Sequence, residues 1–368
     1  MVRIRLSSPP FLPLFLITMR SKSTRTLAHL LLFTLINFSE AFSESDPFHG
    51  SWVYDESYPL YDSAKCPFLD PGFDCLKYGR SDKLYLKYRW KPDAFELPRF
   101  DGVEFLKRWK GKRIMFVGDS LSLNQHDSFL CLLHSTMPDS KISSSQTEEV
   151  ARITKFEEYN VTIMYYLSYY LVDIVRKPIG RVLKLDSIQG GHVWTRSDVL
   201  VFNSWNWWLR DGPAQPWDYM QYGNTTLKDM DRTVAFTKGL QTWAKWVDAS
   251  VNANTTKIFY QGIAPNHYKC SGQEWGGTSE ESCLGQTKPL NTSIYPADPP
   301  PQLAIVKDVI RKISKPVYLL DITLLSQLRI DAHPSKYSGI GYQNDCTHWC
   351  IAGLPDTWNT LFYSALVQ

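Results

Sequence analysis

The sequence predicts an α/β fold in which a parallel β-sheet is flanked by helices. Four short apolar runs with the composition of buried strands alternate with stretches of helical periodicity, and this alternation is typical of a parallel sheet covered on both faces. The composition agrees with such a fold. Of the 368 residues, 43% are hydrophobic and 21% are charged, which allows a sizeable core and excludes a disordered chain.

The regular elements of this sheet begin at residue 102. A short helix is expected at 102–110, and a strand at 112–117 leads through a tight turn into a helix at 121–133. Further strands and helices follow in alternation, with strands at 198–203, 257–262 and 316–321 and helices at 233–249 and 303–313. Functional residues of such folds gather past the carboxyl ends of the strands.

Two regions depart from this alternation. Residues 151–195 alternate between apolar and polar side chains, which predicts antiparallel strands inserted before the second parallel strand. Residues 45–101 show little helical periodicity and hold two cysteines, so an irregular, disulfide-tied segment is expected. The predicted organisation is a leader at 1–43, a cysteine-bearing segment at 44–101 and the main α/β domain at 102–368.

The leader has the features of a secretory signal. An apolar run at 27–38 follows a basic patch and is shorter than the ~20 residues of a membrane helix. The leader is therefore either a signal peptide or a short uncleaved type II signal anchor. Five basic residues and one acidic residue give 1–42 a net charge of +4, so the remainder of a chain with +3 carries −1. This removes the support for nucleic-acid binding through bulk positive charge.

Two further features indicate the secretory route. Four Asn-x-Ser/Thr sequons are candidates for glycosylation, at Asn160, Asn224, Asn254 and Asn291. The seven cysteines are expected to form disulfides in this compartment, and because seven is odd, one thiol should be left over.

The first motif that carries chemistry is Gly118-Asp119-Ser120, directly after the first strand of the main domain. A serine on a sharp strand-to-helix turn has an exposed hydroxyl and an N–H directed to the same space, which suits a nucleophile whose own amide helps bind an oxyanion. Gly118 permits the tight turn. The alternative is an ordinary helix start with Asp or Ser as the N-cap.

The second motif is Asp345-Cys-Thr-His348-Trp-Cys350 near the C-terminus. Asp345 can accept a hydrogen bond from the imidazole of His348 and fix its tautomer, which leaves the other ring nitrogen to take a proton from a serine. The alternatives are a metal site or an Asp-capped loop with a surface histidine. A zinc site needs three or four ligands, and the sequence has no second His/Cys cluster at zinc spacing. Together with Ser120, the motif predicts a Ser-His-Asp esterase-type site.

The third motif lies at 201–208. Asn203 ends the second strand at the edge where Ser120 is expected, so its amide is a candidate oxyanion donor; the alternative is a cap of the next turn. Trp205, Trp207 and Trp208 are expected to form a cleft wall on which sugar rings pack, and core packing is the alternative for any one of them.

Several segments resemble those of the plant trichome birefringence-like proteins and occur in the same order. The resemblance covers about residues 48–365. It includes Gly50-Ser-Trp-Val-Tyr-Asp, Tyr78-Gly-Arg-Ser-Asp82, Phe116-Val-Gly-Asp-Ser-Leu-Ser-Leu-Asn-Gln125, Gly285-Gln-Thr-Lys-Pro289 and Asp345-Cys-Thr-His-Trp-Cys350.

This resemblance implies an SGNH/GDSL-like fold and O-acetylation of plant cell-wall polysaccharides, usually in the Golgi. Ser120 would be the nucleophile, His348 the base and Asp345 its orienting partner. An acetyl donor such as acetyl-CoA or a derived donor would supply the group, and xylan, mannan, xyloglucan or pectin would accept it, with no bound cofactor or metal. The alternatives are a wall-located polysaccharide acetylesterase and a non-catalytic polysaccharide-binding protein.

The resemblance also implies three disulfides and a free thiol at Cys270. The pairs are Cys66–Cys131, Cys75–Cys350 and Cys283–Cys346. Ser45 and Phe95 stand where the family commonly has cysteines, which indicates the loss of one bridge. Asn206 and His126 stand in place of a usual His and Trp, and both are expected near the cleft, where they leave the choice of donor and acceptor open.

Overall fold

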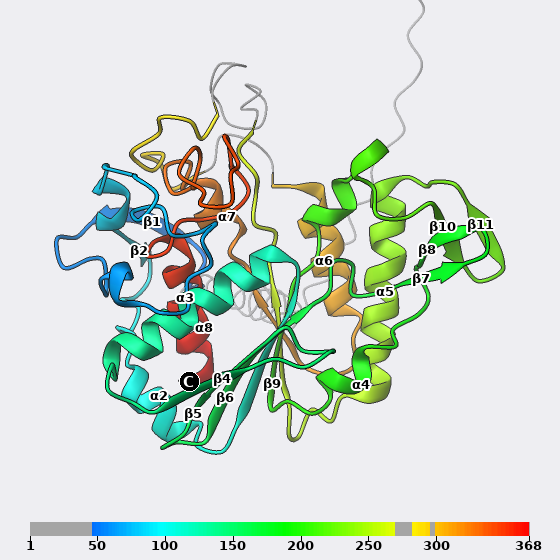
Figure 1. The fold of residues 1–368 in the computed structure, drawn as a ribbon, viewed down its shortest axis with the longest axis horizontal. Helices are drawn as coiled ribbons and strands as arrows, with labels where there is room; N and C mark the ends of the chain where they lie inside the picture. The colour runs from blue at the N-terminus through cyan, green and yellow to red at the C-terminus, as the bar shows by residue number, and fades with distance from the viewer. Residues whose placement is uncertain (1–45, 269–281, 295–298, 368) are drawn as a thin grey trace, which may run out of the picture. The chain divides into compact units, whose positions relative to one another are not determined.

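A seven-stranded sheet with the order β13-β12-β9-β3-β6-β5-β4 forms the centre of the protein (Figure 1). The computed structural model describes residues 46–268, 282–294 and 299–367, and residues from Pro47 onward form one compact unit. Five strands of the sheet are parallel, and β5 and β4 add an antiparallel edge. The strands are β3 (Arg113–Gly118), β4 (Ile142–Ser145), β5 (Arg152–Phe156), β6 (Val161–Leu167), β9 (Val199–Phe202), β12 (Lys257–Gln261) and β13 (Val317–Leu320).

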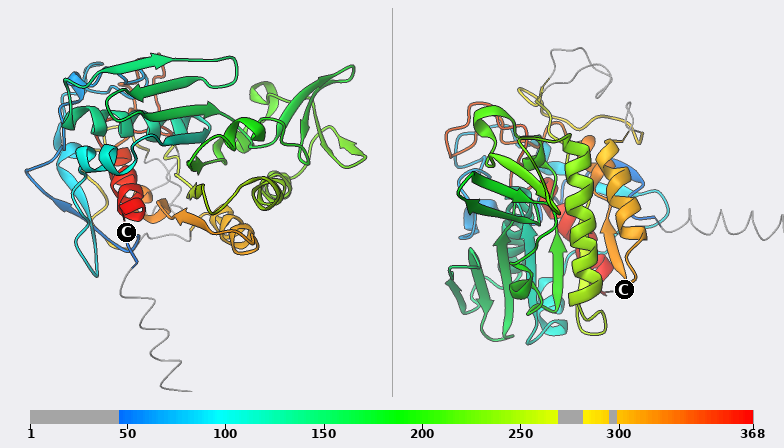
Figure 2. Two further views of the ribbon diagram at one scale, coloured as in Figure 1. Left: turned by 90° about the horizontal axis from the view of Figure 1, so that it is seen from below. Right: turned by 90° about the vertical axis from the view of Figure 1, so that its right-hand side faces the viewer.

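Helices cover both faces of this sheet, and the alternation of side chains along β3 explains why. Ile114 and Phe116 pack with α3 and α8 on one face, while Met115 and Val117 pack with α5 and α6 on the other. Figure 2 shows α5 and α6 side by side on their face. The helices are α2 (Gly102–Arg108), α3 (Ser120–Thr136), α5 (Arg232–Ser250), α6 (Pro301–Arg311) and α8 (Leu354–Val367), with short helices α4 (Gly191–Trp194) and α7 (Thr323–Gln327). The prediction of a helix-flanked, mostly parallel sheet is confirmed.

The expectation for residues 151–195 is only partly correct. Strand β5 is antiparallel to β6, but β6 pairs in parallel with β3 and so belongs to the parallel part of the main sheet. The alternating pattern shows that one face is less buried, but it does not encode the direction of the neighbouring strand. A separate four-stranded sheet lies beyond α5 (Figure 1). Its strands are β7 (Asp173–Lys177), β8 (Gly180–Lys184), β10 (Tyr219–Tyr222) and β11 (Thr225–Leu227).

The N-terminal cysteine-bearing segment packs on the face that α3 and α8 cover. It holds an antiparallel pair, β1 (Gly50–Tyr54) with β2 (Tyr88–Pro92), and two 3₁₀ turns, η1 (Ser63–Lys65) and η2 (Leu84–Lys87). The indole of Trp52 in β1 donates to the carbonyl oxygen of Leu325, at 2.9 Å, which fixes this segment to α7. Among the described residues, no helix combines the length and the hydropathy needed to cross a bilayer. The apolar leader lies outside the described residues.

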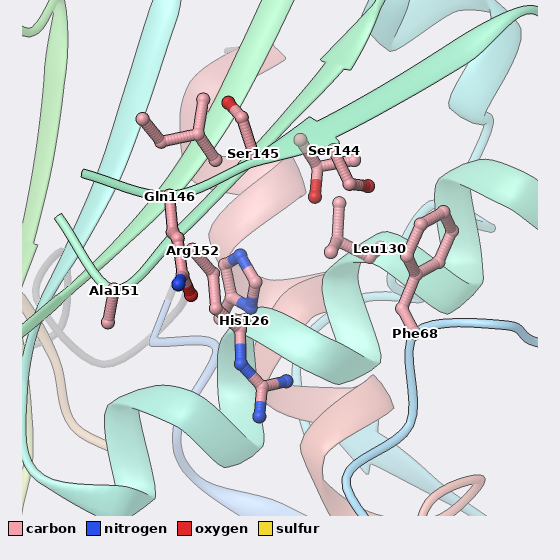
Figure 3. Close-up of a pocket in the computed structure, with 10 residues that line it drawn as sticks. Phe68, His126, Leu130, Ser144, Ser145, Gln146, Ala151 and Arg152 are labelled. Atoms are coloured by element: carbon pink, nitrogen blue, oxygen red, sulfur yellow. The ribbon is translucent and has the colours of Figure 1, made fainter.

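Helix α3 borders two cavities, because it runs from the end of β3 toward the β4–β5 edge of the sheet. Ser120 and Leu123 line one of them, and His126 and Leu130 line the other. Figure 3 shows the second cavity between α3 and the edge strands. The first cavity holds the candidate catalytic residues.

Candidate active site

Ser120 is the first residue of helix α3 and directly follows the turn at the end of β3. Asp119 is the N-cap, and its Oδ1 accepts the N–H of Leu121 at 2.9 Å. The N–H of a first helical residue has no acceptor within the helix, so that of Ser120 is available to a ligand. A Cβ at Gly118 would lie 2.6 Å from the carbonyl oxygen of Asn203 and 2.3 Å from Ser122 Oγ. Glycine therefore lets the turn approach the end of β9.

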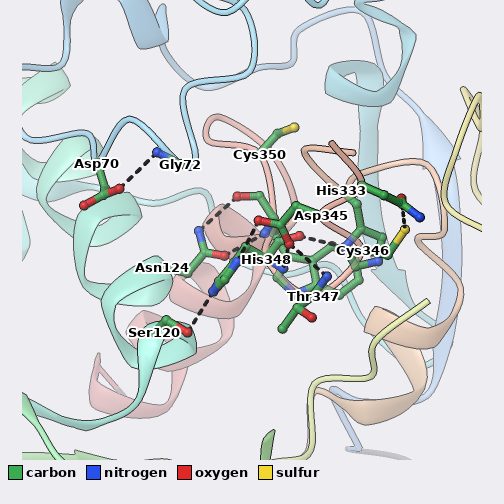
Figure 4. A network of polar contacts seen from close by, with 12 residues as sticks. Asp70, Gly72, Ser120, Asn124, His333, Asp345, Cys346, Thr347, His348 and Cys350 are labelled. Carbon is green, nitrogen blue, oxygen red and sulfur yellow. Dashed lines mark hydrogen bonds and ion pairs between the residues drawn. The ribbon is translucent and has the colours of Figure 1, made fainter. Parts of the chain in front are cut away.

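The structure brings Ser120, His348 and Asp345 into one hydrogen-bonded chain, although 228 residues separate Ser120 from His348 (Figure 4). The hydroxyl of Ser120 lies 2.7 Å from Nε2 of His348, and Nδ1 of His348 lies 2.8 Å from Oδ2 of Asp345. Because the carboxylate accepts from Nδ1–H, Nε2 of the neutral ring is the acceptor for the serine proton. This is the spacing and order that nucleophile, base and orienting group require.

Asp345 is kept ionised and oriented by hydrogen bonds within the loop that it begins. Its carboxylate also accepts the backbone N–H groups of Thr347 and His348, at 3.1 and 3.0 Å. Burial alone would raise the pKa of Asp345, but the hydrogen bonds from His348 and the backbone outweigh it and place the pKa below the ordinary value. The Asp-capped loop and the Asp–His pair are thus both present, and the two interpretations of this motif are compatible.

Asp119 has a different environment from Asp345. Burial raises the pKa of Asp119 to about 6, because the N–H of Leu121 only partly compensates for the loss of solvent. Asp119 lies directly before Ser120 and is excluded from water, so its carboxyl group has a structural role in the turn.

Two groups that the sequence analysis did not single out hold the loop around His348. Asn124, one helical turn after Ser120, donates to the carbonyl oxygen of Trp349 and accepts the N–H of the same residue, at 3.0 and 2.8 Å. His333 is fully buried, and its Nδ1–H donates to the carbonyl oxygen of His348 at 2.6 Å. The sequence signal for Asn124 is its position one helical turn after Ser120. No sequence pattern links His333 to the Asp345–His348 motif.

A second buried histidine supports the first. Since His333 donates from Nδ1 to a carbonyl group, its Nε2 accepts, and His267 Nδ1–H is the donor. Burial lowers the pKa of His333 to about 3 and that of His267 well below its ordinary value, so both rings are neutral. The ring of His333 stacks on Trp349, with centroids 3.8 Å apart.

Two of the three disulfides close on this loop. Cys75–Cys350 and Cys283–Cys346 flank His348 on both sides, and Cys66–Cys131 ties the N-terminal segment to α3. These are the three pairs that the family resemblance implies. Cys270 lies outside the described residues.

The triad opens into a cavity of about 490 Å³. Phe73 from the N-terminal segment contacts the ring of His348, with centroids 5.4 Å apart. Trp207 stacks on Tyr169, with centroids 3.9 Å apart, and the guanidinium of Arg210 lies over Trp207 at 4.9 Å from its centroid. Aromatic, cationic and amide side chains therefore surround the reactive serine; Asn206, Trp207, Arg210, Tyr268 and Asn344 all line this cavity.

The expected wall of three tryptophans is wrong for two of them. Trp205 and Trp208 are buried and pack against Phe236, with centroids 5.0 and 5.7 Å away, whereas Trp207 alone lines the cavity. The cause is the 3₁₀ helix η3 (Asn206–Leu209), whose N-cap residue Trp205 accepts the N–H of Trp208 at its carbonyl oxygen, at 2.9 Å, so that the two residues lie one turn apart. Residues 205 and 208 therefore point into the core and 207 points away from it. A second 3₁₀ turn, η4 (Gly212–Ala214), follows.

Of the other residues expected in the cleft, some line the cavity of the triad and others do not. Asn203 lies beside Gly118 at the end of β9, but it is buried, and its amide donates to Oε1 of Gln261 at 3.2 Å. Its role as an oxyanion donor stays a prediction. Asn206 lines the cavity of the triad, but His126 does not; it lies farther along α3, in the wall of the second cavity. The expectation that His126 borders the catalytic cleft is therefore wrong.

The four sequons lie on the surface. Asn160, Asn224, Asn254 and Asn291 are all exposed. Their positions are compatible with glycosylation, which stays a prediction. Among the described residues, no cluster of three or more His, Cys, Asp or Glu side chains is arranged to bind a metal ion.

Comparison with known proteins gives the class to which this fold and site belong. Residues 97–365 match the model of the PC-Esterase family, described as a GDSL/SGNH-like acyl-esterase family found in Pmr5 and Cas1p, and residues 43–95 match the PMR5 N-terminal domain. Two relatives from Arabidopsis thaliana illustrate the similarity. Protein trichome birefringence-like 39 is 54% identical over 319 residues, which cover 87% of this chain and 86% of the relative. Protein trichome birefringence-like 41 is 50% identical over 349 residues, which cover 94% and 97%.

The chain therefore belongs to the PC-Esterase family, and within it to the trichome birefringence-like proteins. Membership in this family makes it an acyl-modifying hydrolase or transferase.

Proposed function

We propose that the protein is an O-acetyltransferase that moves an acetyl group through an acyl-Ser120 intermediate onto hydroxyls of a plant cell-wall polysaccharide. The observation that carries the proposal is the chain from Ser120 Oγ to His348 Nε2 and from His348 Nδ1 to Asp345, placed in a cavity large enough for sugar units. Acetyl-CoA or a donor derived from it supplies the group. The Golgi lumen or membrane is the proposed location of this transferase. The alternative, a polysaccharide acetylesterase, would be located in the plant cell wall.

The reaction proceeds in two balanced halves. His348 Nε2 takes the proton of Ser120, and the alkoxide attacks the acetyl carbonyl to form a tetrahedral oxyanion. The N–H of Ser120 stabilises this oxyanion, with the Asn203 amide as the candidate second donor. Protonated His348 then gives its proton to the leaving group, and the acetyl ester of Ser120 remains.

In the second half the acceptor hydroxyl replaces the donor. His348 removes its proton as the oxygen attacks the acetyl carbonyl, and the collapse of the intermediate returns that proton to Ser120 Oγ. Water in place of the sugar gives the acetylesterase reaction with the same residues. Transfer dominates only if the bound acceptor excludes water, and the aromatic side chains Phe73 and Trp207 supply apolar surface for that purpose.

One assay separates the transferase, the esterase and a non-catalytic binding protein. The purified protein is incubated with an acetyl donor and deacetylated xylan, mannan, xyloglucan or pectin, and in parallel with the acetylated polymers. A gain of acetyl supports the proposal, a loss selects the esterase, and neither selects the binding protein. Ser120→Ala should abolish either activity, while Ser135→Ala, at the other end of α3, serves as the matched control. Full turnover in Ser120→Ala would contradict the assignment of the nucleophile.

A further inference from the structure

The second cavity along α3 has the surface chemistry of a sugar subsite. Its volume is about 380 Å³, and it lies between α3 and the edge strands β4 and β5 (Figure 3). Phe68 and Leu130 provide apolar surface, while Ser144, Ser145 and Gln146 provide hydroxyl and amide groups. A sugar ring presents apolar C–H faces and polar edges, so it matches a lining that combines both kinds of surface.

A buried hydrogen-bonding atom in the wall of this cavity has no partner. His126 is fully buried, and its Nδ1–H donates to Oδ1 of Asp127 at 2.9 Å. Burial lowers the pKa of His126, so the ring is neutral and Nε2 is an acceptor. Within the described part of the chain, this Nε2 has no hydrogen-bond partner. Buried polar atoms are nearly always satisfied by protein, water or ligand, so this Nε2 is available as an acceptor for a water or for a ligand hydroxyl.

The cavity is aligned with the candidate active site along one stripe of α3. Ser120, Leu123, Asp127 and Leu130 are spaced at intervals of three and four residues, which places them on the same helix face. Ser120 and Leu123 line the first cavity, and Leu130 lines the second. At 1.5 Å per residue, the ten steps from Ser120 to Leu130 span about 15 Å, a distance that a few linked sugar units cover.

An ion cluster forms the wall that the two cavities share. Asp70 lines the first cavity, and its Oδ2 accepts from Nη2 of Arg152 at 2.9 Å. Arg152 lines the second cavity, and its Nη1 donates to both oxygens of Asp127 at 3.0 Å. The N–H of Asp70 also donates to Asp127, so the wall is fixed from both sides. Through their ion pair, Asp70 and Arg152 therefore join the linings of the two cavities.

The compensated charges at the second cavity favour a neutral sugar over a charged one. Arg152 is the only charged side chain among the described residues that line the second cavity, and two carboxylates already compensate it. No uncompensated cation remains there for the carboxylate of a uronic acid. The hydroxyl and amide groups of Ser144, Ser145 and Gln146 suit a neutral sugar instead.

From this arrangement, we infer that the cavity between α3 and the β4–β5 edge is a distal subsite for a neutral sugar unit of the polysaccharide whose acetylated unit lies at Ser120. This inference rests on the proposed function, since it extends the same substrate beyond the triad. The subsite increases affinity for longer chains and leaves the chemistry at Ser120 as it is.

The test uses binding, so it does not depend on acetyl transfer. The Ser120→Ala protein is titrated by calorimetry with short and long oligosaccharides of xylose, mannose and galacturonic acid. Ser144→Trp fills the cavity, and Gln146→Ala truncates a lining side chain. Ser143→Trp is the matched control, because Ser143 is a neighbouring exposed serine of β4 that does not line the cavity and whose hydroxyl donates to Glu157 instead. Melting curves of all variants check that they fold.

The inference predicts that long neutral oligosaccharides bind about tenfold more tightly than short ones, the contribution of about one to two good hydrogen bonds. This gain should be lost in Ser144→Trp, reduced in Gln146→Ala and kept in Ser143→Trp. No gain with chain length, a gain that persists in Ser144→Trp, or a gain restricted to galacturonic acid chains would overturn it. A gain lost in Ser144→Trp, together with no acyl transfer or hydrolysis by the protein that retains Ser120, would refute the proposed function and leave the subsite standing.

Discussion

The Nδ1–H of the buried His333 donates to the backbone carbonyl oxygen of His348, at 2.6 Å. His348 therefore has two independent supports. Asp345 holds its ring, and His333, itself supported by His267, holds its main chain. Because both buried rings are neutral, this support does not compete electrostatically with the protonation of His348 during catalysis.

Replacing His333 should lower kcat more than it changes KM. His333→Phe keeps a ring against Trp349 but leaves the His348 carbonyl without its donor, at a cost of about 1–3 kcal/mol. If all of this cost appears as misplacement of Nε2, kcat falls about 5- to 150-fold. Kinetics on a small acetyl ester and on the polymer measure the two constants.

His333→Asn, which retains an N–H donor on a shorter side chain, should recover part of the loss. A purely structural role would instead lower the melting temperature of both variants without separating their kcat values. Equal kcat values for His333→Phe and His333→Asn at a temperature where both are folded would contradict the positioning role.

The three neighbouring tryptophans should respond differently to truncation. Trp207→Ala removes a cavity-lining ring and should raise KM for polysaccharide, with a small effect on unfolding. Trp205→Ala empties a core position against Phe236 and should cost about 3–5 kcal/mol of unfolding free energy. Denaturant unfolding and polymer kinetics, run on both variants, check the assignment; a larger stability loss in Trp207→Ala than in Trp205→Ala would contradict it.

The parts of the fold that were predictable are those whose signal is local. The strands β3, β9, β12 and β13 are short apolar runs, and α5 and α6 have clear periodicity, so each could be located to within a few residues. Helix α8 was not predicted, because nearly all of its residues are buried and its polar residues, such as Asp356, Asn359 and Thr360, are buried with the apolar ones, so no exposed polar face marks its period.

The site was predictable where residue type and spacing carry the chemistry, and not where the fold creates the partnership. Ser120 and the Asp345–His348 pair are recognisable from strand–turn–serine and Asp-x-x-His patterns. His267 and His333 lie 66 residues apart and meet only in the folded chain. The orientation of Trp205, Trp207 and Trp208 depends on a single 3₁₀ turn, which cannot be recognised from the composition of the segment.

The buried carboxyl group of Asp356 should make the protein more stable in mild acid. Burial raises the pKa of Asp356 to about 6, although Ser128, Gly353 and Tyr61 donate hydrogen bonds to it. Because this folded-state pKa exceeds the unfolded one near 4, the stabilisation is complete below about pH 4 and is lost as the pH rises to about 6. A pKa of about 6 in the folded state against about 4 in the unfolded state corresponds to roughly 3 kcal/mol.

Asp356→Asn removes this titration and should reduce the slope of unfolding free energy against pH between about pH 4 and pH 6 by about half, because buried Asp119, whose pKa is also raised to about 6, titrates in the same range. Denaturant unfolding at several pH values measures it. The exposed Asp139→Asn is the control and should keep the wild-type slope. A wild-type slope in Asp356→Asn would show that Asp356 is ionised throughout this range.

The disulfide Cys75–Cys350 should contribute to catalysis as well as stability, because it ends two residues after His348. Replacing both cysteines by serine should cost about 2–4 kcal/mol of unfolding free energy and also lower kcat at temperatures well below unfolding, since the loop loses its tie to the N-terminal segment. The double serine variant of Cys66–Cys131, whose bridge closes on α3 away from the loop, is the matched control. It should lose comparable stability and retain kcat. If the two double variants retain kcat equally, the bridge beside His348 stabilises the fold alone and has no part in positioning the base.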